Sequence, residues 1–317
     1  REFPMMYFKI AGRALALLML LGAALAVRAE KNSTPGISGL AKIEDGVYVA
    51  IHDEKVRKDS AQEGPRVSIV RLKGEEEVSI TPIQVDWSGL LGGRTNDLES
   101  VCGIVDAPGE FIAVESGHRG PDFGRIIHLR AVKKDAEWSF VVLGNITLPD
   151  NLPDNSACKD IEAAQTFKRD GETYLLLGKR GMDEKKGRLI WGKLDWNHPL
   201  FRVAGDVKFY TGMQKLNVPG EKRYCSDLLI SNGEIYASSC NDPGDEGPFT
   251  SAVYHLGHIN QTGHDMIHLI GHAPAEVIRY DGHKVEALAP PLKEGGLWVA
   301  GTDDEHLGGS IFITKTP

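Results

Sequence analysis

Acidic residues recur at one position of a repeated pattern. Glu99, Glu162 and Glu286 each lie twelve residues before an aromatic residue. Carboxylate oxygens bind hard cations such as Ca²⁺ or Mg²⁺, and neighbouring carboxylates with different pKa values can divide acid and base roles. The recurrence predicts that the three glutamates meet in the fold as catalytic groups.

Further polar residues follow the aromatic residues, where each second strand is expected to end. His118 is the predicted catalytic partner of the glutamates, and Arg119, Lys179 and Arg180 are predicted to bind an anion such as a phosphate or carboxylate. Asn241 and Asp242 are further predicted ligand-binding residues. The predicted metal ligands are Glu286, Asp303 and Asp304, holding Ca²⁺ or Mg²⁺.

The aromatic residues that follow the acids are part of a longer repeat, with successive spacings of 63, 63, 62 and 62 residues. Each lies in a β-rich segment that follows a turn, so the repeated unit is a strand hairpin. Four antiparallel strands in each unit predict an all-β fold, a single five-bladed β-propeller over residues 30–317. The repeated aromatic residues are Tyr48, Phe111, Tyr174, Tyr236 and Trp298.

The propeller explains how distant residues could meet. In each hairpin the start of the first strand lies beside the end of the second, so both ends fall on one face around the axis. Simple hairpin register pairs Glu99 with His118 and Glu162 with Lys179, although a bulge would shift either pair. This end of the propeller is called the axial face. Its predicted residues are Glu99, His118, Arg119, Glu162, Lys179, Arg180, Asp242, Glu286, Asp303 and Asp304.

The last repeat is short, because the chain ends after its third strand. The last blade is therefore expected to be either incomplete or closed by an N-terminal strand, for which residues 31–38 are a candidate.

The N-terminal segment and the composition bear on location and partners. Basic residues precede a thirteen-residue apolar run at 14–26, and small residues follow, so residues 1–29 are expected to be an export signal with a few preceding residues. The expected protein is periplasmic or secreted, without stable membrane insertion. A net charge of -8 argues against nucleic acid as a partner. We expect a monomer that binds a small anionic or phosphoester ligand.

The cysteines and histidines give two further expectations. Hairpin register pairs Cys225 with Cys240, which predicts a disulfide in an exported protein. Cys102 and Cys158 are a second candidate pair. His264, His268 and His272 are four residues apart. They would suit either a transition-metal site or a solvent-facing strand.

The acidic motifs resemble those of a known family. Asp97-Leu-Glu99, Asp160-Ile-Glu162 and Lys284-Val-Glu286 are similar to the repeated Asp-Leu-Glu-Gly motifs of the esterase-like phytase domain family. That resemblance implies an exported propeller with activity on ester bonds. The sequence departs from the family pattern at the glycine position, where Ser100, Ala163 and Ala287 stand.

Two hypotheses for function follow. In the first, the protein is a metal-assisted phosphoesterase or esterase that uses the axial face. In the second, the propeller uses the same face to bind a ligand or protein without catalysis. A third interpretation is structural, because acids at strand starts can also accept backbone hydrogen bonds and fix loops.

Overall fold

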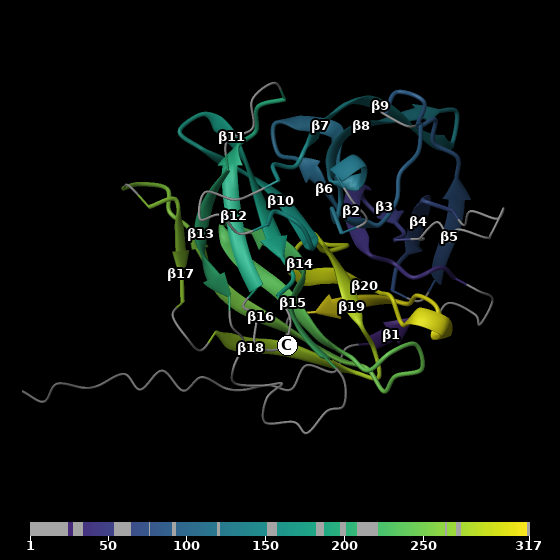
Figure 1. The fold of residues 1–317 in the computed structure, drawn as a ribbon. Helices are drawn as coiled ribbons and strands as arrows, with labels where there is room; N and C mark the ends of the chain where they lie inside the picture. The colour runs from purple at the N-terminus through teal and green to yellow at the C-terminus, as the bar shows by residue number, and fades with distance from the viewer. Residues whose placement is uncertain are drawn as a thin grey trace, which may run out of the picture.

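The computed structural model confirms an all-β, five-bladed propeller (Figure 1). It describes residues 25–27, 34–53, 65–75, 77–90, 93–118, 121–150, 157–181, 187–196, 201–207, 221–263, 265–270 and 274–315. Helical structure within these ranges consists of two 3₁₀ turns, η1 (Pro121–Phe123) and η2 (Glu305–Leu307). None of the helices in the described part is long and apolar enough to span a membrane.

The strands of each blade take the same four places from the axis outward. The innermost strands are β2 (Gly39–Glu44), β6 (Leu98–Ile104), β10 (Ile161–Arg169), β14 (Glu221–Ser231) and β19 (Val285–Ala289). The second strands are β3 (Val47–Ile51), β7 (Ala107–Glu115), β11 (Glu172–Lys179), β15 (Glu234–Asp242) and β20 (Gly296–Thr302). The third strands are β4 (Val67–Lys73), β8 (Arg125–Lys134), β12 (Gly187–Lys193), β16 (Thr250–Ile259) and β21 (Ile311–Lys315). The outer strands are β5 (Glu77–Ile83), β9 (Glu137–Thr147), β13 (Phe201–Val207), β17 (Ile267–Leu269) with β18 (Ala275–Asp281), and β1 (Leu25–Val27).

The repeated aromatic residues all lie in second strands, as the spacing predicts. Alternation within each strand sends successive side chains to the two faces of a blade, and both faces pack against a neighbouring blade. Apolar clusters therefore fill the spaces between blades, for example Ile112 and Leu175 between the second and third blades. Trp298 is 1% exposed and packs between the fourth and fifth blades.

The axis is closed by a polar contact between innermost strands. Ser100 Oγ of β6 accepts a hydrogen bond from Ala164 N of β10 and donates to Asp227 Oδ1 of β14. Leu288 N of β19 donates to Asp227 Oδ2 at 2.6 Å. Asp227 is 1% exposed, and burial raises the pKa of its carboxyl well above the ordinary range. Four of the five blades are thus linked around one buried carboxyl group.

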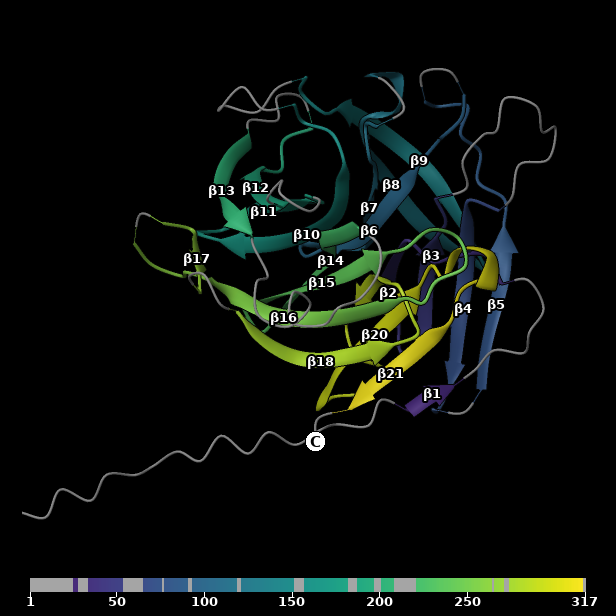
Figure 2. The same cartoon turned by 60° about the horizontal axis from the view of Figure 1, so that its bottom comes forward.

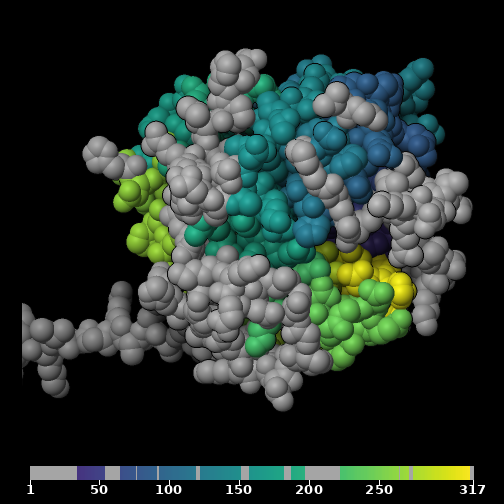
Figure 3. Space-filling model, viewed as in Figure 1, coloured from purple at the N-terminus to yellow at the C-terminus, as the bar shows by residue number. Residues whose placement is uncertain are grey.

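The fifth blade is completed by an N-terminal strand, one of the two predicted outcomes. Strand β1 pairs with β21 through Leu25↔Ile313, so the closing strand lies earlier in the chain than the candidate residues 31–38. Strand β1 falls inside the predicted signal segment. The chain from residue 34 onward lies at the end of the same blade, where Ile37 N donates to Thr302 O at 2.9 Å. The turned view in Figure 2 shows β1 beside β21, and the purple first blade meets the yellow fifth blade in Figure 3.

Candidate functional site

The recurring glutamates lie at register shifts in three innermost strands. Residues on either side of each glutamate pair regularly with the second strand, so the glutamate itself is the extra residue of a β-bulge. A bulge redirects one side chain without disturbing the rest of the strand. This places each acid at the axial face, and the three shifts lie between Leu98 and Ser100, between Ile161 and Ala163, and between Val285 and Ala287.

In the second and third blades, the residue two positions before the bulge has a left-handed backbone conformation. Asp97 and Asp160 have positive φ angles of 61° and 60°. Aspartate tolerates this left-handed conformation better than most residues, so the Asp-x-Glu motif has a conformational role in addition to its charge. Lys284 occupies the equivalent position in the fifth blade.

Three carboxylates from the first two blades form a compact group, called here the carboxylate group. Asp53, Asp97 and Glu99 each offer an oxygen atom, and these atoms lie within 4.8 Å of one another. Asp97 and Glu99 are buried, and Asp53 is partly buried. Oxygen ligands in this number and at this separation fit a hard cation such as Ca²⁺ or Mg²⁺.

The loop that carries Asp97 is held by a buried ion pair. Arg125 donates two hydrogen bonds of 2.8 Å to the carboxylate of Glu115, and both side chains are almost completely buried. Glu115 Oε1 also accepts from Asn96 N at 3.1 Å, and Ser116 Oγ donates to Asp97 Oδ2. The buried Arg125–Glu115 pair therefore fixes the loop in which Asp97 lies close to Asp53 and Glu99.

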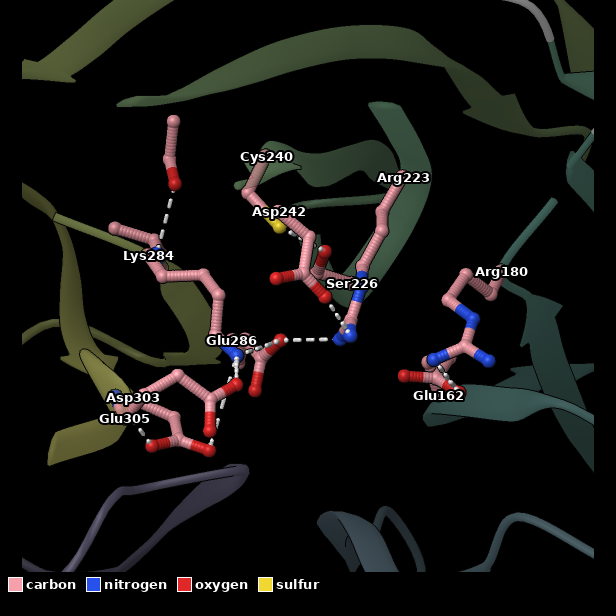
Figure 4. A network of polar contacts seen from close by, with 12 residues as sticks. Glu162, Arg180, Arg223, Ser226, Cys240, Asp242, Lys284, Glu286, Asp303 and Glu305 are labelled. Carbon is pink, nitrogen blue, oxygen red and sulfur yellow. Dashed lines mark hydrogen bonds and ion pairs between the residues drawn. The ribbon is translucent and has the colours of Figure 1, made fainter. Parts of the chain in front are cut away.

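The remaining blades place acids and cations in alternation, in a set called here the ion-pair network (Figure 4). Arg223 Nη1 lies 3.0 Å from Glu286 Oε1, and its other nitrogen bonds to Asp242. Arg180 Nη1 lies 3.5 Å from Glu162 Oε1. The members of the network are Glu162, Arg180, Arg223, Asp242, Lys284, Glu286, Asp303 and Glu305.

Lys284 is the centre of the network in the fifth blade. Its side chain is 1% exposed, and its Nζ lies 3.4 Å from Glu286 Oε1 and 4.0 Å from Asp303 Oδ2, with Glu305 as a further partner. Burial alone would lower the pKa of this ammonium group, but the carboxylates of Glu286 and Asp303 raise it well above its usual value. Lys284 is therefore a permanent buried cation.

Two acids of the network hold their protons more tightly than usual. Burial, followed by the charge of Glu286, raises the pKa of Asp303 to about 8. Burial also raises the pKa of Glu162, against the attraction of Arg180. With a pKa of about 8, Asp303 can be protonated near neutral pH and can donate a proton.

The structure uses several predicted site residues differently. Asp304 accepts a hydrogen bond of 2.7 Å from Lys284 N and contacts His283, which fits the structural interpretation of the acids. Asn241 bonds to Pro248 O and Thr250 N, so it holds a loop. Lys179 donates to Ala157 O at 2.5 Å. His118 contacts Asp160 at 2.9 Å, and Arg119 lies outside the described residues.

The predicted disulfide between Cys225 and Cys240 is not formed, because all four cysteines are free and buried. The register of β14 and β15 pairs Arg223 with Cys240 and then resumes at Asp227, so Cys225 lies in the intervening irregularity. Its sulfur packs toward Gly178 of the third blade, while Cys240 Sγ lies 3.2 Å from Ser226 Oγ. Cys102 and Cys158 share an apolar cluster, also as free thiols.

Sequence reasoning did not select Asp53, Asp97, Arg223, Lys284 or Glu305 as site residues. For Lys284 a signal existed, because it stands where Asp97 and Asp160 stand in the motif. Arg223 lies just before the irregular part of β14, where no repeat unit offers an equivalent residue.

The fold resembles solved propeller structures at low sequence identity. An exo-1,5-α-L-arabinanase from a bovine ruminal metagenomic library has a TM-score of 0.48 and 12% identity, covering 90% of this chain and 95% of that one. A thermostable family-43 glycoside hydrolase has a TM-score of 0.49 and 12% identity, covering 91% and 96%. An arabinanase from Bacillus subtilis has a TM-score of 0.42 and 12% identity, covering 89% and 96%. At this identity the likeness concerns the fold alone.

No protein-family model matches the chain, and no curated protein sequence is similar to it. The resemblance to the esterase-like phytase family therefore stays a prediction.

Proposed function

We propose that the axial face binds a divalent cation, Ca²⁺ or Mg²⁺, and hydrolyses a small anionic ester beside it. The observation that carries this proposal is the carboxylate group. Three carboxylates this close offer a divalent cation several oxygen ligands at once. Oxygen-only ligation favours a hard cation over a transition metal.

The bound cation would polarise the ester and offset the negative charge that develops on it. The ion-pair network supplies the remaining roles from this chain. Arg180, whose side chain is 19% exposed, and Arg223 are the proposed groups that bind the anionic oxygens of the ligand. Asp303 is the proposed proton donor to the leaving oxygen, since its raised pKa of about 8 keeps it protonated near neutral pH.

The proposal includes export to the periplasm or secretion, supported by the predicted signal segment. It also includes a monomeric protein with a phosphoester or other anionic ester as its ligand. The support for an ester rests on the cations of the network together with the resemblance of the acidic motifs.

The test begins with metal content. The full chain is treated with EDTA, reloaded with Ca²⁺ or Mg²⁺, and assayed with a nitrophenyl phosphate, a nitrophenyl acetate and an aryl glycoside. Glu99→Gln is expected to lower cation affinity by roughly tenfold or more and to reduce ester turnover with it. Glu110→Gln is the matched control, because Glu110 pairs with His128 and Arg130 away from the axial face.

The outcomes separate the hypotheses. Cation binding without ester turnover would favour the non-catalytic binding propeller and overturn the hydrolytic half of the proposal. Turnover of the glycoside instead of the esters would change the reaction class. Equal cation affinity in wild type and Glu99→Gln would overturn the cation site itself.

A further inference from the structure

A row of glutamate and histidine side chains, residue types that can bind metals, crosses strands β15, β16 and β17 of the fourth blade. Strand register pairs Glu234 of β15 with His258 of β16, and His258 with His268 of β17. Directly paired residues on antiparallel strands project from the same face of the sheet. Glu234, His258 and His268 therefore form one continuous row across three strands.

The two imidazole rings of this row lie close together. Their centroids are 4.9 Å apart with an interplanar angle of 30°. His258 is partly buried and His268 is exposed, so solvent reaches the pair from one side. Two imidazoles at this separation can turn one nitrogen each toward a shared ion, given metal–nitrogen distances of about 2.0–2.1 Å.

The backbone fixes this approach. A side chain on Gly257 would overlap the carbonyl oxygen of His268, with its Cβ only 1.9 Å from that atom, so glycine allows β17 to lie tightly against β16. The turn between the strands is held by hydrogen bonds from Asn260, whose N donates to Met266 O at 2.9 Å and whose Nδ2 donates to Asp265 O at 2.8 Å. His258 and His268 are thus presented on a constrained hairpin.

A carboxylate lies next along the row. Glu234 Oε2 and His255 Nε2 are 2.5 Å apart. A register shift between Ile235 and Tyr236 turns His255 to the same face as Glu234. The carboxylate of Glu234 is thus engaged by His255, which leaves the paired imidazoles of His258 and His268 as the metal-binding groups of this row.

We propose that His258 and His268 form a binding site for a late first-row transition metal, with Zn²⁺, Ni²⁺ or Cu²⁺ as its occupant. Imidazole favours these ions over Ca²⁺ or Mg²⁺, so the site differs in chemistry from the carboxylate group. It also differs from a site built on the sequence spacing of His264, His268 and His272, because the partner of His268 is a residue from the neighbouring strand. His264 and His272 lie outside the described residues.

The test titrates the full chain with Ni²⁺ and Zn²⁺ by calorimetry at neutral pH. His268→Ala is expected to weaken binding by roughly tenfold or more, because it removes one of two imidazole ligands. His268 is exposed, so this variant should keep the wild-type melting temperature in the absence of metal. His258→Ala should weaken binding as well.

Two controls make the result specific. The double variant His264→Ala/His272→Ala should bind Ni²⁺ as wild type does, and so should Glu99→Gln, which alters the carboxylate group. Unchanged affinity in His268→Ala, or loss of affinity in the His264/His272 variant with His268 intact, would overturn the proposed site.

Discussion

Two sides of the axial face each carry a bulged glutamate, but the side chains around the two glutamates differ. In the second blade, Asp97 precedes the bulged Glu99 by two residues, and both lie near Asp53. In the fifth blade the equivalent position is Lys284, which lies 3.4 Å from the bulged Glu286. The residue at this position is thus aspartate beside the candidate cation site and lysine inside the fifth-blade ion pair, while in the third blade Asp160 precedes Glu162, which pairs with Arg180.

The comparison separates two ways to keep carboxylates buried. The ion-pair network neutralises its acids with cations from the chain itself. The carboxylate group gathers three acids within 4.8 Å, which a bound cation would neutralise. The first arrangement should govern folding, and the second should govern metal dependence.

The largest effect is expected from removing the buried cation of the network. Lys284→Met leaves Glu286, Asp303 and Glu305 without their shared partner, and breaking such a buried pair costs about 3–5 kcal/mol of unfolding free energy. Urea denaturation measures the loss. Lys168→Met is the control, because it removes an exposed pair with Asp106 and should change stability by less than about 1 kcal/mol. A similar small loss in Lys284→Met would remove the distinction between the two sides.

A smaller effect is expected from the cation itself. Ca²⁺ at a hundredfold excess over its dissociation constant should stabilise the protein by about 2.7 kcal/mol, since it binds the folded state alone. Asp53→Asn should abolish this gain, while Glu162→Gln in the ion-pair network should retain it. Thermal unfolding with and without Ca²⁺ measures both. If Glu162→Gln lost the gain and Asp53→Asn kept it, the cation would belong to the other side.

The last effect concerns Asp227, which accepts hydrogen bonds from Ser100 of β6 and Leu288 of β19. Its pKa is raised by burial above the ordinary 3.8, so the folded protein keeps this proton where the unfolded chain has released it. This contribution to stability is full below about pH 4 and declines as pH rises toward the folded pKa. The hydrogen bonds from Leu288, Leu228 and Ser100 oppose the effect of burial only in part.

Asp227→Asn checks this by removing the titration. Urea unfolding of the variant should show a flatter dependence on pH than wild type between pH 4 and neutrality. A steeper dependence in the variant would mean that the carboxyl is ionised in the folded protein at these pH values.

Much of the fold was predictable from sequence because its signal is periodic. The aromatic residues of the second strands recur every 62 or 63 residues, and all five occupy equivalent places. A blade tolerates variation elsewhere as long as these buried positions and the turns between strands persist. Ring closure was less predictable, since the apolar residues of β1 are also typical of a signal segment.

The sequence predicted which acids belong to the candidate site, but not which residues those acids contact. Simple hairpin register predicts that Glu162 pairs with Lys179. In the structure Ile161 pairs with Lys179, and the bulged Glu162 instead contacts Arg180. The same difficulty produced the incorrect pairing of Cys225 with Cys240. Bulges and irregular registers depend on contacts between blades, such as the packing of Cys225 against Gly178, which local sequence does not reveal.

The contact between the first and fifth blades also bears on the order in which the protein folds. Each blade is made mostly of strands that follow one another in the chain, so its hairpins can form from local contacts. Asp53 and Asp303, in contrast, come to the same face only when the segment around Ile37 joins Thr302 and the ring closes. Closing so long a loop carries an entropic cost, which makes it a late step in folding. The axial face is then the last part of the molecule to be assembled, and its ligand would be bound by the finished ring alone.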